Sequence, residues 1–285
     1  MVMAQGMQWH SRFGRWRARA GAMFMAALVV ASPVAAQQTE TREGVNVGEN
    51  SRIAKLVPAE KLERLATEQY GQMMRAAAGK GALLPAEHPQ VQRVRRISAQ
   101  IVGQSQRFNS RASQWKWEVN VVNDPQINAF CMPGGKIGIY TGILEKLKLT
   151  DDELAMVIGH EVAHALREHA RERAAKGTLT EVGAGAQLVT LGFSRGNETD
   201  ADLVGLDVAA RAGYDPRSAI RVWEKMGAAS KGAPPQWLST HPASTTRISE
   251  IRKHLDETLP LYARAKGLSV DSLPPYTSNW GEPIR

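Results

Sequence analysis

The stretch Glu153–Ala170, ELAMVIGHEVAHALREHA, decides how this chain is interpreted. It contains a His-Glu-x-x-His pattern at His160, Glu161 and His164. Residues four apart on an α-helix differ by only about 40° in direction, so both imidazoles leave one face and can share a zinc ion. Glu161 lies about 100° from His160, where it can reach a metal-bound water without being a ligand. Polar groups in so apolar a helix are costly to bury unless something binds them, so the stretch predicts a metal site.

A catalytic zinc ion normally has three protein ligands, so a third must come from elsewhere. A histidine six residues after the second one would supply it, but that position is Ala170. His169 would lie about 140° round the helix and is expected at the surface. Glu198 and Asp202 are four apart before an apolar run, which suggests Glu198 as the third ligand and Asp202 as acceptor of the outward N–H of His160. An acidic first helical turn that merely favours the helix dipole is the alternative.

Composition limits the class of protein. The chain has 285 residues, of which 43% are hydrophobic and 22% charged, as in a globular protein with a real core. The formal net charge is +8, but residues 1–36 supply +4 of it through four arginines and no acid. No dense basic stripe with interleaved aromatic residues is visible, so nucleic acid is not expected as a partner. The single Cys131 excludes an internal disulfide and a cysteine-rich zinc site.

The N-terminus has the order of an export signal. Basic residues 10–19 precede the apolar run Ala20–Ala31, and small residues follow up to Ala36 and Gln37, where cleavage is expected. The apolar run of about 12 residues is short for a membrane-spanning helix, which needs roughly 20. An uncleaved anchor is the alternative. We therefore expect a signal peptide and a periplasmic mature protein, whose single thiol suits an oxidising compartment.

Hydrophobic periodicity predicts an α+β fold, mainly helical, with a small and mostly antiparallel sheet beside the His-Glu-x-x-His helix. Three segments have strand character: 115–121, 127–132 and 136–140. Helical spacing, caps and breakers predict helices from Pro58 to Gly79, from Pro89 on, over 151–175, from Asn197 to Gly213, over 216–226 and over 245–259.

Three motifs in order resemble the HtpX and CAAX-prenyl-protease family of zinc metallopeptidases. They are ELAMVIGHEVAHALREHA, NETDADLVGLDVAARAGYDP and STHPASTTRI, within roughly Glu87–Leu255. The chain looks most like the soluble, exported members of the BepA and LoiP kind. The resemblance implies a gluzincin with one zinc ion held by His160, His164 and Glu198, and with Glu161 as the catalytic base. Four segments are then expected: a signal peptide (1–36), a flexible leader (37–57), the metallopeptidase domain (58–262) and a poorly ordered C-terminal tail (263–285).

The leading hypothesis is a zinc endopeptidase that cleaves unfolded or misassembled cell-envelope proteins, outer-membrane proteins included, with peripheral association with the envelope membrane. The substrate would lie extended along Asn128, Ala129 and Phe130 and add itself to the sheet edge, with Gly134 keeping the cleft open. An ordinary hairpin is the alternative. A different class is a zinc-stabilised periplasmic chaperone or assembly factor with incidental proteolysis. The intact Glu161 favours the enzyme, because a binding module needs no base there.

Two residues of STHPASTTRI have open roles. In one reading, His241 or Arg247 stabilises the oxyanion of the reaction. In a second, His241 takes the open zinc position of a resting enzyme. In a third, Arg247 is a structural cap or salt bridge.

Overall fold

The computed structural model describes residues 43–178, 192–230, 235–241 and 245–285, and the description below concerns these residues. The expected signal peptide, residues 1–36, lies outside them. The α-helices are α1 (Ala59–Gly79), α2 (Pro89–Val102), α3 (Thr141–Lys146), α4 (Asp151–Leu166), α5 (His169–Arg173), α6 (Arg195–Arg211), α7 (Ser218–Ala229), α8 (Gln236–Thr240), α9 (Thr245–Lys253) and α10 (Leu255–Lys266). Short turns of other helix types are η1 (Arg52–Leu56), η2 (Ser105–Arg107), η3 (Ser110–Gln114), η4 (Ala174–Thr178) and η7 (Val270–Ser272). None of the described helices is long and apolar enough to cross a membrane.

The sheet has three strands, β1 (Glu118–Val122), β2 (Ala129–Met132) and β3 (Lys136–Tyr140), in the order β1-β3-β2. β2 and β3 form an antiparallel pair, as their short connection requires, whereas β1 runs parallel to β3. The α+β class is therefore confirmed, and the small sheet is mixed. In the part of the chain that the structure describes, β2 is an edge strand on the side of α4.

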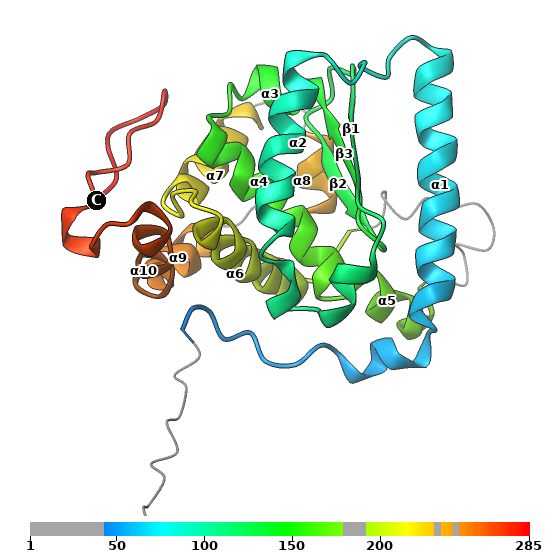
Figure 1. Ribbon diagram of the computed structural model, residues 1–285, viewed down its shortest axis with the longest axis horizontal. Coiled ribbons are helices and arrows are strands. Elements are labelled where there is room, and N and C mark those ends of the chain that lie inside the picture. The colour runs from blue at the N-terminus through cyan, green and yellow to red at the C-terminus, as the bar shows by residue number, and fades with distance from the viewer. Residues whose placement is uncertain (1–42, 179–191, 231–234, 242–244) are drawn as a thin grey trace, which may run out of the picture. The chain divides into compact units, whose positions relative to one another are not determined.

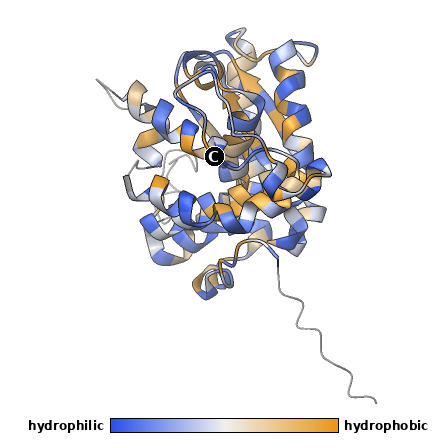
Figure 2. Ribbon diagram, turned by 90° about the vertical axis from the view of Figure 1, so that its left-hand side faces the viewer, coloured by the Kyte–Doolittle hydropathy of each residue, from blue (hydrophilic) through white to orange (hydrophobic). Residues whose placement is uncertain are grey.

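The two faces of the sheet are covered by different helices. Figure 1 shows α1 on one side of the sheet, with α2 and α4 on the other. Phe130 and Met132 of β2 join the α1 cluster around Tyr70, whereas Ala129 joins the larger core. This alternation follows from the two-residue period of a strand. Figure 2 shows apolar, orange ribbon concentrated where helices and sheet meet.

α4 and α6 cross in close backbone contact at a pair of glycines. A Cβ atom on Gly159 would lie 2.8 Å from the carbonyl oxygen of Gly205, and one on Gly205 would lie 2.8 Å from the backbone nitrogen of His160. No other residue type fits at either position without moving a helix. The crossing therefore sets how closely side chains of α6 approach those of α4.

The helix expected over 151–175 ends earlier. α4 stops at Leu166, and Glu168 has a left-handed backbone with φ of 55° before α5 begins at His169. A non-glycine residue in this conformation turns the chain sharply, so helical extrapolation fails beyond Arg167. The π turn η4 follows α5.

Two further helix predictions differ from the structure. Asn197 was expected to cap α6, but the N-cap is Ser194, and Asn197 completes the capping box from within the first turn. The helix expected over 245–259 is two helices, α9 and α10, with a break at His254. Both differences concern helix ends, which local sequence specifies weakly.

The expected flexible leader is packed onto the domain over residues 43–57. Val45 is buried, and its N–H donates to Asp207 Oδ2 of α6 at 3.1 Å. Arg167 donates to three backbone carbonyls of this segment, at residues 47, 48 and 49. We call residues 45–50 the strap.

The C-terminal segment, expected to be poorly ordered, is also held. Tyr276 and Ile284 are buried and exchange two backbone hydrogen bonds of 2.7 and 2.9 Å. Arg217, paired with Asp215 inside the fold, donates to the carbonyl of Pro274 at 2.8 Å. The internal hairpin and this arginine satisfy backbone groups that an isolated tail would leave to water.

Candidate metal centre

The start of α4 is fixed by its cap. Thr150 Oγ1 accepts from the N–H of Glu153, and Glu153 Oε2 accepts from the N–H of Thr150, which is a complete capping box. Lys225 of α7 donates to the same carboxylate at 2.7 Å in a buried ion pair. Two turns further on, this anchored helix presents His160 and His164 towards α6.

Four buried side chains converge at one point between α4, α6 and the end of α8. His160, His164, Glu198 and His241 each place a ligand atom within 4.8 Å of all the others. The Nε2 atoms of His160 and His164 are 3.0 Å apart. Glu198 places Oε2 3.6 Å from His160 Nε2 and Oε1 3.5 Å from His164 Nε2.

These residues fit a zinc ion. Ligand atoms about 2.0–2.1 Å from a tetrahedral ion lie about 3.3 Å apart, and the distances above fall on either side of that value. Glu198 Oε1 and His241 Nε2 are buried and have no hydrogen-bond partner among the described residues. Buried acceptors left without a partner are costly, and a cation at this point would satisfy both.

The protonation states of the four clustered residues also favour a metal site. Burial lowers the pKa of His160, and it lowers the pKa values of His164 and His241 strongly, so the imidazoles are neutral, as metal ligands must be. Burial raises the pKa of Glu198 to about 8, although Arg247 opposes this. A carboxylate so poorly stabilised as an anion is one that a dication would stabilise.

Asp202 and Arg247 hold the ligands from the side opposite the ion position. Asp202 Oδ1 lies 3.0 Å from His160 Nδ1. Arg247 donates to both oxygens of Asp202, at 2.6 and 2.7 Å, and to Glu198 Oε2 at 2.6 Å. Burial disfavours the charged form of Asp202, but Arg247 and His160 outweigh it and lower its pKa. The guanidinium carbon also lies 3.7 Å from the centre of the Trp223 ring.

The position of Arg247 distinguishes between the two roles proposed for it, oxyanion stabilisation and a structural salt bridge. Its Nη2 is 3.4 Å from His160 Nδ1, whereas an ion would lie on the Nε2 side of that ring. Three N–H groups of the guanidinium donate to the carboxylates of Asp202 and Glu198. Among the alternatives for Arg247, the geometry favours the structural salt bridge over the oxyanion role.

His169 is not at the surface, and this expectation from the helical angle is wrong. The ring is only 2% exposed, and its Nδ1 lies 2.9 Å from Nδ1 of His164. The left-handed residue Glu168 turns the chain back and brings His169 to the outer nitrogen of the ligand. Phe193 stacks on the other side of the His164 ring, with centroids 3.8 Å apart.

Glu161 is held by a tryptophan that sequence reasoning missed. Trp237 Nε1 donates to Glu161 Oε1 at 2.6 Å, and the same oxygen lies 3.7 Å from His241 Nε2. Burial raises the pKa of Glu161 well above that of an ordinary carboxyl. Trp237 also stacks on His241, with centroids 4.8 Å apart. The only hint in the sequence was that Trp237 lies four residues before His241 in the same segment.

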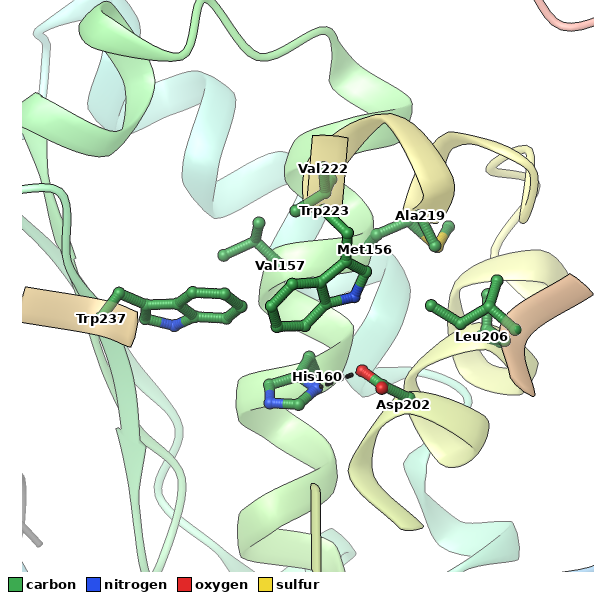
Figure 3. A pocket seen from close by; sticks show the side chains of 10 residues that line it. Met156, Val157, His160, Asp202, Leu206, Ala219, Val222, Trp223 and Trp237 are labelled. Carbon is green, nitrogen blue, oxygen red and sulfur yellow. Dashed lines mark hydrogen bonds and ion pairs between the residues drawn. The ribbon is translucent and has the colours of Figure 1, made fainter. Parts of the chain in front are cut away.

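A small cavity of about 20 Å³ lies beside the centre. Figure 3 shows Trp223 and Trp237 side by side next to His160, with Asp202 hydrogen-bonded to the ring. The remaining walls are apolar and come from α4, α6, α7 and α9. The space suffices for about one water molecule, and Trp237 of α8 forms one of its walls.

The expected substrate-binding residues lie on or beside the edge strand. The carbonyl of Asn128 accepts from the N–H of Tyr140 at 3.1 Å, so this pair is hydrogen-bonded. Because such pairs alternate in antiparallel ladders, the N–H and C=O of Ala129 point away from β3. The Phe130 side chain faces α1 rather than the centre, and Gly134, with φ of 78°, forms the turn after β2. In the structure both Ala129 and Phe130 are buried, and the N–H of Ala129 donates to Asn128 Oδ1 at 3.0 Å.

A His-Glu-x-x-His helix whose imidazoles meet a glutamate from a second helix defines a gluzincin-type metallopeptidase centre. The sequence matches Peptidase family M48 over residues 85–184 and 176–255. The chain therefore belongs to peptidase family M48.

Several curated proteins are similar to this chain. The mitochondrial metalloendopeptidase OMA1 of Saccharomyces cerevisiae is 36% identical over 211 residues, which are 64% of this chain and 61% of that protein. The OMA1 protein of Arabidopsis thaliana is 40% identical over 163 residues, 51% of this chain and 33% of that protein. The beta-barrel assembly-enhancing protease of Escherichia coli is 25% identical over 174 residues, 51% of this chain and 36% of that protein. The chain thus spans between a third and three fifths of these relatives.

Two expectations change with these comparisons. The broad family is confirmed, but the narrower likeness to BepA and LoiP is not, because OMA1 proteins are more similar. The expected periplasmic location is contradicted, since the more similar relatives are mitochondrial proteins. An arginine-rich, acid-free N-terminus is also the composition of a mitochondrial targeting segment, so this pattern does not separate the two.

Proposed function

We propose that this protein is a zinc-dependent endopeptidase that cleaves extended segments of unfolded or misassembled membrane-associated proteins. One observation carries the proposal: His160, His164 and Glu198 form a buried ligand cluster with Glu161 on the adjacent helix position. The names of the relatives, metalloendopeptidase and assembly-enhancing protease, support the same chemistry.

The residues of the centre have different roles in peptide hydrolysis. Zinc, when bound by the three ligands, supplies a Lewis acid that polarises the scissile carbonyl and makes water more acidic. Glu161 takes a proton from the attacking water and returns it to the leaving amine. Burial favours the protonated form of Glu161, in which the carboxyl group holds the proton between the two steps. Asp202 and Arg247 keep His160 and Glu198 in place.

The substrate proposal rests on the edge of β2. The N–H of Ala129 donates to Asn128 Oδ1 at 3.0 Å, and the backbone of Cys131 is hydrogen-bonded to Glu161, so an extended chain would have to replace these bonds to pair with the edge beside α4. Folded proteins rarely offer a free extended segment, whereas unfolded or misassembled ones do. Protein quality control is therefore the setting that we propose.

Segment α8 would have to move before such a substrate reaches the centre. His241 stands among the ligands, Trp237 holds Glu161, and the N–H of Trp237 donates to the carbonyl of Ile127 just before β2. We propose that the structure is a resting form and that His241 occupies the open ligand position in it.

Cleavage of casein by Glu161→Gln tests the function. We expect cleavage to fall by about 10²–10⁴, the usual contribution of a general base, with zinc content unchanged. Glu145→Gln is the matched control, because Glu145 is exposed on α3. Wild-type activity in Glu161→Gln would refute the hydrolytic mechanism. If that variant is inactive but still prevents aggregation of an unfolded client, the chaperone alternative is favoured.

A further inference from the structure

The outer nitrogens of the two histidine ligands have different partners. His160 Nδ1 meets the carboxylate of Asp202 directly at 3.0 Å. His164 Nδ1 meets another imidazole, that of His169, at 2.9 Å. His169 Nε2 in turn lies 3.1 Å from Asp200 Oδ2. The second ligand thus reaches its carboxylate through an intervening ring.

Only one arrangement of protons satisfies this chain when His164 binds a metal through Nε2. His164 then carries its proton on Nδ1 and must donate it, so His169 Nδ1 must be an acceptor. A neutral His169 therefore carries its proton on Nε2, where Asp200 accepts it. The carboxylate selects the tautomer of His169, and His169 selects that of His164. Carboxylate partners of ligating histidines act in this way directly.

The surroundings restrict this chain to one geometry. His169 is only 2% exposed, so its ring is held in the interior beside His164. Asp200 is fixed by Arg167, whose Nε donates to the same Oδ2 at 2.6 Å. Arg167 is itself bound to three carbonyls of the strap. Within residues 43–178, 192–230, 235–241 and 245–285, the side-chain hydrogen bonds of His169 are those to His164 and Asp200.

We propose that His169 is a positioning residue, which together with Asp200 holds His164 in the metal-binding tautomer and thereby sets the zinc affinity of the centre. This inference rests on the proposed zinc function and deepens it. In this chain the functional pattern therefore extends beyond His-Glu-x-x-His to His169, which acts on the site without being a ligand.

Three substitutions of the full chain test the proposal, with the zinc dissociation constant measured by chelator competition. His169→Leu keeps the bulk and removes both hydrogen bonds. His169→Gln places an amide near the former Nε2, within reach of Asp200 but not of His164. His169→Asn places an amide oxygen near the former Nδ1, where it can accept from His164.

We expect His169→Leu and His169→Gln to bind zinc about 10–100-fold more weakly, and His169→Asn to recover most of that loss. The visible absorption of the Co²⁺-loaded protein should change in the first two and resemble wild type in the third. Circular dichroism in excess chelator establishes that each variant is folded. If His169→Leu does not fold, the zinc affinities of His169→Gln and His169→Asn are compared instead, and the difference between them decides whether His169 has the proposed role.

Unchanged zinc affinity in His169→Leu, or equal affinities of the Gln and Asn variants, would overturn the proposal and leave His169 a packing residue. A wild-type protein that binds no zinc would overturn both this inference and the proposed function. A wild-type protein that binds zinc but cleaves no polypeptide would overturn the proposed function alone, and the affinity series would still decide the role of His169.

Discussion

Replacing Arg247 by methionine tests whether this guanidinium is structural. The side chain is buried and donates three hydrogen bonds to the carboxylates of Asp202 and Glu198. Methionine keeps much of the volume and the contact with Trp223 but removes the charge. Glu198, with a pKa of about 8, is mostly protonated at pH 7 without metal, so Asp202 is the charge left unpaired.

The expected cost can be worked from these contacts. Removing one partner of a buried ion pair costs about 3–5 kcal/mol. The alternative for Asp202 is to take up a proton, which from an ordinary pKa costs about 4 kcal/mol at pH 7. Both values agree, so we expect a loss of about 3–5 kcal/mol in the free energy of unfolding. Arg247→Lys keeps one charge but cannot bridge two carboxylates, and should lose about half as much.

Urea unfolding at pH 7 in excess chelator measures this loss, with the midpoint falling and the slope unchanged. Arg252→Met is the matched control on the same helix, because Arg252 is exposed, and it should change stability by less than about 0.5 kcal/mol. The structural assignment fails if Arg247→Met unfolds at the wild-type midpoint yet has lost kcat at full zinc loading, since that result belongs to an oxyanion role.

Three further results are expected. The pKa of Glu198 is raised in the folded state, so its stabilising contribution is complete below about pH 4.5 and is lost as pH rises towards 8. The free energy of unfolding of the metal-free protein should therefore fall by roughly 2 kcal/mol between pH 6 and 8. Thermal unfolding of Glu198→Gln should lack this part of the pH dependence. Trp237→Phe removes the bond to Glu161 and should raise casein cleavage by loosening α8; a fall in kcat at unchanged KM would instead show that the indole orients the base. Gly205→Ala should lower the free energy of unfolding by about 1–3 kcal/mol and weaken zinc binding, because the added Cβ separates α4 from α6. Gly227→Ala, with open space around it, should be neutral or stabilising in the same urea assay. Equal effects of the two substitutions would refute the close crossing.

The residues of the metal centre that lie close together within one helix could be predicted from the sequence. His160, Glu161 and His164 lie within one helix, so the helical period alone brings them together. Glu198 and Asp202 could be proposed because they also share one helical face and because a zinc ion needs a third ligand. Alternation predicted a strand over 115–121, where the structure has β1, and the strands predicted over 127–132 and 136–140 correspond to β2 and β3.

The remaining features depend on contacts that no periodicity encodes. His169 was misplaced because a single positive φ at Glu168 ends the helix, and a glutamate gives no sign of that. Trp237 reaches Glu161 across 76 positions of sequence. The leader and the C-terminal segment looked disordered by composition, yet buried polar groups such as Asp207 and Arg217 bind their backbone.

An exposed β2 edge would have a cost apart from catalysis. Unpaired N–H and C=O groups on an edge strand will pair with any extended chain, including another copy of the same protein, and such pairing begins aggregation. The hydrogen bond from Trp237 to Ile127 places α8 against the start of this edge. A protease that receives clients by strand addition therefore has reason to uncover the strand only briefly, and variants locked open should be more active and less soluble together.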